Sequence, residues 1–212
     1  MRNTLTIISF LFFSTFLMAQ SNEWRVWGGI KTSSLRQGSQ PFYITFEDYS
    51  RIVNAIQPIQ LSTYSLVYSH KISTKWHLSL GLNYNKKGFK AIFYDSSPSV
   101  ATSKINVIRD YWGFLIGTRY NIYQKNSWKM NIEILANPEF AKLELQDVKK
   151  FAVSSIALLN IEKQISGNFS IVLNPFFETS LMKYKSYTFD ESFQYSPYGY
   201  GLMAGIKYSI SK

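Results

Sequence analysis

Hydrophobic and polar residues alternate with a period of two along much of the chain. The clearest stretch is Trp76-His77-Leu78-Ser79-Leu80-Gly81-Leu82-Asn83-Tyr84, in which every even position is large and apolar or aromatic and every odd position is small or polar. This pattern predicts a β-strand with one apolar face. A tilted strand crosses a bilayer with about 9–11 residues, and Trp76 and Tyr84 stand where interfacial aromatic residues would. In a soluble sandwich the same face would cover a core, so this stretch alone leaves both structures open.

The same alternation predicts further strands on both sides of this stretch. The eight expected strands span residues 24–35, 61–71, 76–84, 108–123, 128–136, 151–162, 169–177 and 198–210. Tight turns are expected at 72–75, 124–127 and 163–168, and longer or polar connections, such as 36–60, 143–150 and 185–196, alternate with them. Tight turns at one end and long loops at the other are typical of an outer-membrane barrel.

Two parts of this layout are less regular. The faces of the stretch 151–162 cannot be assigned from its pattern. Within residues 36–60, apolar side chains recur at helical spacing and predict a short amphipathic helix; they are Phe46, Tyr49, Ile52, Val53 and Ile56. Whether this connection instead adds a hairpin, giving ten strands, stays open.

Composition narrows the class of protein. Aromatic residues make up 17% of the 212-residue chain, as do charged residues, and there is no cysteine. Outside the N-terminus no apolar run approaches the roughly 18–20 residues of a membrane helix, so a membrane-embedded part would have to be built from strands. The net charge is +10, but the basic residues are scattered singly, which argues against nucleic-acid binding.

The N-terminus has the features of a secretory signal peptide. Arg2 supplies the positive charge, residues 5–18 the apolar stretch and Ala19 a small residue for cleavage. We therefore expect a signal peptide at 1–19, cleaved after Ala19 or Gln20, and an exported domain at 20–212; a retained anchor is the alternative.

Two ten-residue segments repeat one pattern. The segment 131–140 ends in Asn137-Pro138-Glu139-Phe140 and the segment 168–177 ends in Asn174-Pro175-Phe176-Phe177, and each also begins with Asn. With the leader, the strand layout and the glycine- and tyrosine-rich segment 198–210, the chain resembles the small outer-membrane barrels of the OmpA/OmpX type, most nearly the PorT-like barrel domains. Such barrels often end on an aromatic residue, whereas this chain ends in Ser211-Lys212.

The resemblance implies a closed antiparallel up-and-down transmembrane β-barrel of about eight strands, with short periplasmic turns and longer extracellular loops. It implies a monomer in the outer membrane, in contact with lipid and lipopolysaccharide and inserted by the barrel insertion machinery. Aromatic residues expected at the membrane interfaces are Trp76, Tyr84, Trp112, Trp128, Tyr198 and Tyr208.

An eight-stranded barrel has an interior just wide enough for side chains to fill. A diffusion pore is therefore not expected. Charged residues at inward positions should neutralise one another in pairs; the candidates are Arg119, Lys129, Glu133, Glu178 and Lys207. A narrow ion path or a small-ligand site is the alternative for the interior.

Candidate chemistry is sparse. His77 and Ser79 are two residues apart on one strand face, a spacing that resembles the histidine–serine pair of lipid A deacylases, but they should point inward beside a periplasmic turn. Asp95, Asp147, Asp190 and Glu191 are expected to be solvated loop residues, so no metal and no cofactor is predicted.

We therefore predict a non-enzymatic outer-membrane barrel with a structural, surface-contact or assembly role carried by the extracellular loops 36–60 and 185–196. The alternatives are a lipid A-modifying enzyme and a soluble periplasmic β-barrel or sandwich that binds a ligand.

Overall fold

The computed structural model describes residues 22–37, 42–45, 50–53, 55–93, 103–141, 151–182, 184–188 and 191–210. The expected signal peptide at 1–19 and three of the acidic loop residues, Asp95, Asp147 and Asp190, lie outside these ranges. Among the described residues, no helix is long and apolar enough to cross a membrane.

Eight antiparallel strands form one closed ring. In the order of the ring they are β1 (Asn22–Gln37), β5 (Ile59–Lys71), β6 (Trp76–Phe93), β7 (Ser103–Lys125), β8 (Trp128–Ala141), β9 (Phe151–Ser166), β10 (Phe169–Ser180) and β12 (Glu191–Ile210). The first and last strands close it, since β1 pairs with β12 along its whole length, from Asn22 opposite Ile210 to Gln37 opposite Tyr195. The predicted eight-stranded up-and-down barrel is confirmed.

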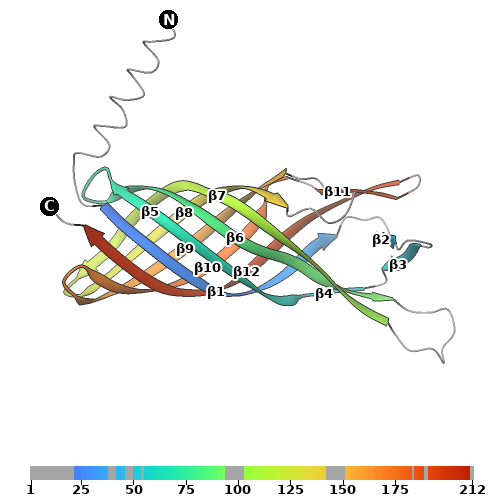
Figure 1. Cartoon of the computed structure of the whole chain (residues 1–212), viewed down its shortest axis with the longest axis horizontal. Coiled ribbons are helices and arrows are strands. Elements are labelled where there is room, and N and C mark those ends of the chain that lie inside the picture. The colour runs from blue at the N-terminus through green and yellow to red at the C-terminus, as the bar shows by residue number, and fades with distance from the viewer. Residues whose placement is uncertain are drawn as a thin grey trace, which may run out of the picture.

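The two ends of the barrel differ. The beginning of β1, the end of β12 and the tight turns lie at one end, which we call the turn end; the long connections lie at the other, the loop end (Figure 1). Two of the tight turns have two residues, and their first residues, Asn126 and Gly167, have φ angles of 52° and 42°. Positive φ favours Asn and Gly, so local chemistry fixes these turns.

The first long connection contains strands where a helix was predicted. β2 (Phe42–Thr45) and β3 (Ser50–Val53) form a separate two-stranded sheet, and β4 (Ala55–Gln57) pairs with β6. The predicted helix is wrong because β6 extends past the barrel and offers β4 a strand edge, against which Ile56 also finds apolar partners. Phe46 and Tyr49 lie outside the described residues. The connection thus adds a hairpin but leaves the ring at eight strands.

Strands β6, β7 and β12 extend well beyond the bounds that their patterns predict. β12 begins at Glu191 and pairs with β11 (Tyr184–Thr188), so part of the expected loop 185–196 is a hairpin. β6 and β7 stay paired from Trp76 opposite Tyr120 to Phe93 opposite Ser103. Their part beyond Tyr84 and Trp112, which we call the β6–β7 extension, has an apolar cluster on its inner side: Leu35, Phe89, Ala91 and Phe93, with Ile56, Ile105 and Val107 packed against it.

Candidate functional site

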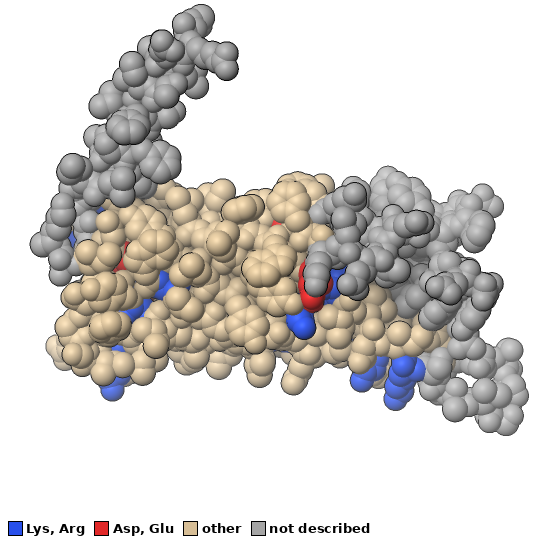
Figure 2. All heavy atoms as spheres, in the orientation of Figure 1, with Lys and Arg blue, Asp and Glu red and all other residues tan. Residues whose placement is uncertain are grey.

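The outer face of the barrel is apolar. Large hydrophobic side chains point away from the barrel on every strand of the ring, for example Trp112 (58% exposed), Phe114 (52%) and Ile134 (57%). On the face drawn in Figure 2, a broad band around the middle of the barrel carries no Lys, Arg, Asp or Glu, and charged atoms appear toward the ends. In a protein folded in water, side chains of this size are usually buried.

Aromatic residues mark both edges of this band. At the loop end five of them stand opposite one another on neighbouring strands: Tyr64, Tyr84, Trp112, Phe140 and Phe151. The ring centroids of Tyr84 and Trp112 are 4.9 Å apart. At the turn end the ring pairs are Trp24–Tyr68 at 5.0 Å, Trp76–Tyr120 at 4.8 Å and Phe169–Tyr208 at 5.0 Å.

The six aromatic residues predicted for the interfaces are placed on this outer face. Trp76, Trp128 and Tyr208 lie near the turn-end termini of their strands. Tyr84 and Trp112 belong to the loop-end row, and Tyr198 is paired with Thr179 close to the loop-end terminus of β10. Two rows of aromatic side chains with aliphatic ones between them is the arrangement found on barrels in a lipid bilayer.

The interior is divided into three layers. Along β1 the inward residues run from Arg25 through Trp27 to Lys31, and along β8 from Glu133 through Leu135 to Glu139. Strands β1 and β8 thus each place a charged side chain toward the turn end, an apolar side chain in the middle and another charged side chain toward the loop end. We call the two charged layers the turn-end network and the loop-end network, and the middle one the apolar layer.

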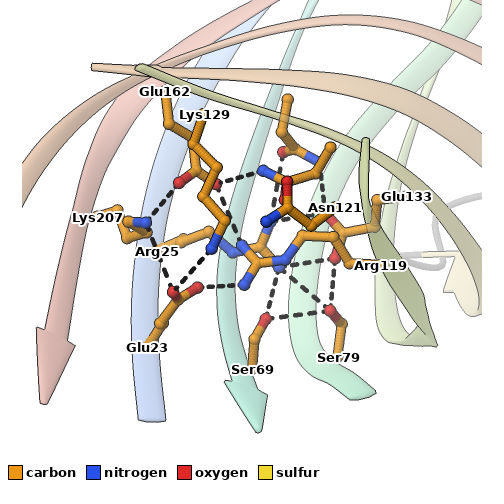
Figure 3. A network of polar contacts seen from close by, with 12 residues as sticks. Glu23, Arg25, Ser69, Ser79, Arg119, Asn121, Lys129, Glu133, Glu162 and Lys207 are labelled. Atoms are coloured by element: carbon orange, nitrogen blue, oxygen red, sulfur yellow. Dashed lines mark hydrogen bonds and ion pairs between the residues drawn. The ribbon is translucent and has the colours of Figure 1, made fainter. Parts of the chain in front are cut away.

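The turn-end network joins four cations to three carboxylates (Figure 3); its members are Glu23, Arg25, Arg119, Lys129, Glu133, Glu162 and Lys207. Arg25 donates from both terminal nitrogens to Glu133, each at 2.6 Å, and one of them also donates to the Ser69 hydroxyl at 2.6 Å. Both residues are fully buried, so each charge depends on the other for compensation.

The remaining members form a second set of contacts around Glu23 and Glu162. Arg119 pairs with Glu23 and, at 3.2 Å, with Glu162. Lys207 pairs with Glu162 and lies 3.5 Å from Glu23, and Lys129 lies 3.9 Å from Glu23. Because Glu23 and Glu162 each bind several cations, they link five different strands across the interior. Backbone hydrogen bonds, in contrast, link only strands that are neighbours in the sheet.

The apolar layer closes the middle of the barrel. Its members are Trp27, Val67, Leu115, Leu135, Ile156, Leu158, Phe176 and Met203. They come from seven strands, and the eighth, β6, has Gly81 between Val67 and Leu115. A Cβ atom on Gly81 would lie 2.4 Å from the Leu66 carbonyl oxygen, so only glycine fits there. A cavity of about 10 Å³ borders this layer, enough for roughly one water molecule.

Among the described residues, the loop-end network joins two lysines to two glutamates. Glu178 accepts from Lys31 at 2.7 Å and from Lys87 at 2.8 Å, and Lys87 also pairs with Glu139. Asn85 accepts from Lys31 and donates to Glu178 at 2.7 Å. Both buried ammonium groups therefore have carboxylate partners, as burial requires.

The five charged residues predicted to point inward lie in these two networks: Arg119, Lys129, Glu133 and Lys207 at the turn end and Glu178 at the loop end. Six further charged members of the networks were not predicted: Glu23, Arg25, Lys31, Lys87, Glu139 and Glu162. Arg25 and Lys31 share a strand face with Trp27, so alternation was a usable signal for them. Glu162 lies on the strand whose faces the pattern left unassigned, and Lys87 lies beyond the predicted end of its strand.

The structure places His77 and Ser79 inside the barrel, 2% and 0% exposed. The Ser79 hydroxyl donates to Glu133 and contacts Ser69 at 3.0 Å and Arg25 at 3.2 Å, so its described partners do not include His77. The Nδ1 atom of His77 is buried without a hydrogen-bond partner. The Ser79 hydroxyl is thus held between the Glu133 carboxylate and the Arg25 guanidinium in the interior of the barrel.

No group of His, Cys, Asp and Glu side chains suited to a metal ion occurs among the described residues. The side chain of Glu191 is not described, although its backbone begins β12.

No protein-family model matches the chain, and no curated protein matches it. Several solved structures are similar to the chain. The outer membrane protein OprG from Pseudomonas aeruginosa has a TM-score of 0.55 at 10% identity, over 90% of this chain and 97% of that one. The outer membrane protease OmpT from Escherichia coli has a TM-score of 0.49 at 10% identity, over 91% and 98% of the two chains. Ail, the attachment invasion locus protein of Yersinia pestis, has a TM-score of 0.44 at 13% identity, over 90% and 100%.

The similarity to OprG covers nearly the whole of both chains and shows a shared fold. At 10% identity it carries no information about ligands or activity.

Proposed function

We propose that this protein is an integral outer-membrane β-barrel without a diffusion pore, which acts through the structures at its loop end. The observation that carries the proposal is the inverted distribution of side chains. Arginine, lysine and glutamate fill the interior, whereas tryptophan, phenylalanine, leucine and isoleucine cover the outside. A lipid bilayer is the solvent in which such a surface is stable.

The same distribution argues against the soluble alternative. A soluble barrel or sandwich buries its large apolar residues and exposes its charges, because about 25 cal/mol is gained for each Å² of apolar surface removed from water. Here Trp24, Trp76, Trp112 and Trp128 are all between 44% and 58% exposed, and Arg25 and Arg119 are fully buried. Exposed apolar surface that surrounds a protein on all sides favours membrane insertion over a single docking patch.

The interior argues against a role as a pore through which solutes diffuse. The apolar layer lies between two ion-paired networks, so a hydrated ion or solute has no continuous polar path through the described part of the barrel. The buried, bonded state of Ser79 argues in addition against the lipid A-modifying alternative. Placing the turn end in the periplasm leaves the β6–β7 extension and the sheet of β2 and β3 outside the cell for structural, surface-contact or assembly roles.

Quenching of tryptophan fluorescence by brominated lipids tests the membrane proposal. One variant keeps only Trp112, with the other four tryptophans changed to Phe, and its control keeps only Trp27, which is 2% exposed inside the barrel. In vesicles of lipids brominated near the headgroups, we expect strong quenching of Trp112 and much weaker quenching of Trp27. Absence of quenching of Trp112, in a variant with the wild-type circular dichroism spectrum, would contradict the proposal.

A further inference from the structure

The described acidic residues are distributed unequally between the two sides of the barrel wall. Every glutamate whose side chain is described lies inside: Glu23, Glu133, Glu139, Glu162 and Glu178. The charged residues outside are almost all basic, and Asp110 is the acidic residue among the described outer side chains. Among the described residues, the outer side chains therefore carry an excess of positive charge, and the inward glutamates are already paired with inward cations.

Three of these outer lysines lie together on the β6–β7 extension. Lys86 and Lys90 follow Tyr84 on the outward positions of β6, and Lys104 lies on β7 opposite Ile92. The pairing of β6 with β7 has no register shift along this extension, so the alternation of faces continues through it. Lysine and arginine atoms project from the barrel on this side of the apolar band (Figure 2).

The extension holds these lysines in place. Its inner side packs against an apolar cluster that includes Phe89, Phe93 and Leu35, and β4 pairs along its edge. Within the described part of the chain, Lys86, Lys90 and Lys104 form no ion pair. Asp110, opposite Lys86, is hydrogen-bonded by the Tyr84 hydroxyl. The lysines are thus fixed on a folded surface with their charges available to a partner.

Their spacing identifies the kind of partner. At about 3.4 Å per residue, Lys86 lies about 7 Å along the strand beyond Tyr84 and Lys90 about 20 Å beyond it, less when the strand tilt is included. Phospholipid headgroups present phosphates in one layer. Lipopolysaccharide presents them at several depths, on lipid A and on its inner core sugars, so it matches cations that are spread along a strand above an aromatic row.

We propose that the outer face of the β6–β7 extension, through Lys86, Lys90 and Lys104, binds the phosphate groups of lipopolysaccharide in the outer leaflet. The inference rests on the proposed outer-membrane location. The Tyr84 and Trp112 rings, which precede Lys86 and Asp110 on the outer face in the register, would contact the acyl chains of the same molecule.

Binding of fluorescently labelled lipopolysaccharide to the refolded full-length barrel in detergent tests this proposal. The variant K86Q/K90Q/K104Q removes the three charges, and the matched control K75Q/K125Q/K163Q removes three exposed lysines at the turn end. Because each lysine near an anionic surface contributes on the order of a few-fold in binding, we expect the first variant to bind at least roughly tenfold more weakly and the control to stay within about twofold of wild type. Equal effects of the two variants would overturn the proposal.

Three further measurements keep the test decisive. Dephosphorylated lipopolysaccharide should bind wild-type protein as weakly as intact lipopolysaccharide binds K86Q/K90Q/K104Q. Vesicles of phosphatidylglycerol should compete poorly with labelled lipopolysaccharide for the wild-type protein. If they compete as well as unlabelled lipopolysaccharide does, the choice of lipopolysaccharide as the partner is overturned. The mobility of each unboiled variant on an SDS gel shows whether it has folded into a barrel. If wild-type protein never forms a heat-sensitive barrel in detergent or lipid, the proposed outer-membrane location is wrong. If the barrel forms but K86Q/K90Q/K104Q binds lipopolysaccharide as tightly as wild type, only the proposed lipopolysaccharide site is wrong.

Discussion

Arg25 and Glu133 are the most deeply buried pair of opposite charges in the turn-end network, with neither side chain exposed. Glu133 also accepts from Ser79 and from Asn160, the latter at 3.0 Å, so three strands besides its own depend on this one carboxylate. Taking two such groups out of water is costly, and their mutual attraction offsets the cost only while both are present.

Removing one partner should therefore destabilise the barrel more than removing both. We expect Glu133→Gln to lower the free energy of unfolding by about 3–5 kcal/mol, because the Arg25 charge stays buried without its carboxylate. The double variant R25M/E133L should recover much of this loss. Urea unfolding in lipid vesicles, followed by tryptophan fluorescence, measures both, with the exposed Lys125→Gln as the control. A Glu133→Gln variant as stable as wild type would show that water already solvates this pair.

Among the connections of the barrel, the turn between β7 and β8 shows how local chemistry fixes strand order. Lys125 and Trp128 are paired across only two residues, and the first of these, Asn126, has a φ of 52°. Asn adopts this left-handed conformation more readily than residues with branched side chains do.

Substitutions of Asn126 should follow this preference. Asn126→Gly should keep or slightly raise the stability of the barrel, and Asn126→Val should lower it by about 1–2 kcal/mol, because a β-branched residue is strained at positive φ. Urea unfolding midpoints of the two variants check the prediction. Equal midpoints would mean that the turn adopts another conformation in the folded protein.

The strands themselves were largely predictable, because a period-two pattern and turn residues such as Asn126 and Gly167 are local signals. Their extents were not. The pattern predicts that a strand ends near Tyr84, but β6 continues to Phe93 because β7 and β4 supply pairing partners that are distant in sequence. The spacing of Ile52 and Ile56 fits a helix as well, but Ile56 is in a strand because β4 pairs with the distant β6, and Ile52 is in the hairpin of β2 and β3.

The charged interior was predictable in kind but only in part by residue. Alternation assigns Arg119 and Glu133 to the inner face, yet it cannot show that Arg119 reaches Glu23 on a strand that is not its neighbour in the sheet. Which inward residue meets which depends on strand tilt and on closure of the ring. Neither property is encoded in any single segment.

For the whole molecule, the three layers of the interior predict a closed barrel. Purified protein in a planar bilayer should show no steady conductance, whereas L135G/F176G, which removes two side chains of the apolar layer, should admit ions at a measurable rate because the two charged layers would then be joined by water. The conservative variant Leu135→Met serves as the control. Steady conductance of the wild-type protein at the level of a general porin would contradict the closed interior.

Residence in the outer membrane, with the apolar outside of the closed barrel in lipid and its charged inside shielded, is the property on which the proposed function depends. It is tested most directly by the gel mobility of the outer-membrane fraction in SDS, with and without boiling. We predict that the protein is found in this fraction and that the unboiled band migrates differently from the boiled one, because the closed barrel resists SDS until it is heated. Recovery of the protein from the soluble periplasm, with one mobility before and after boiling, would contradict the account.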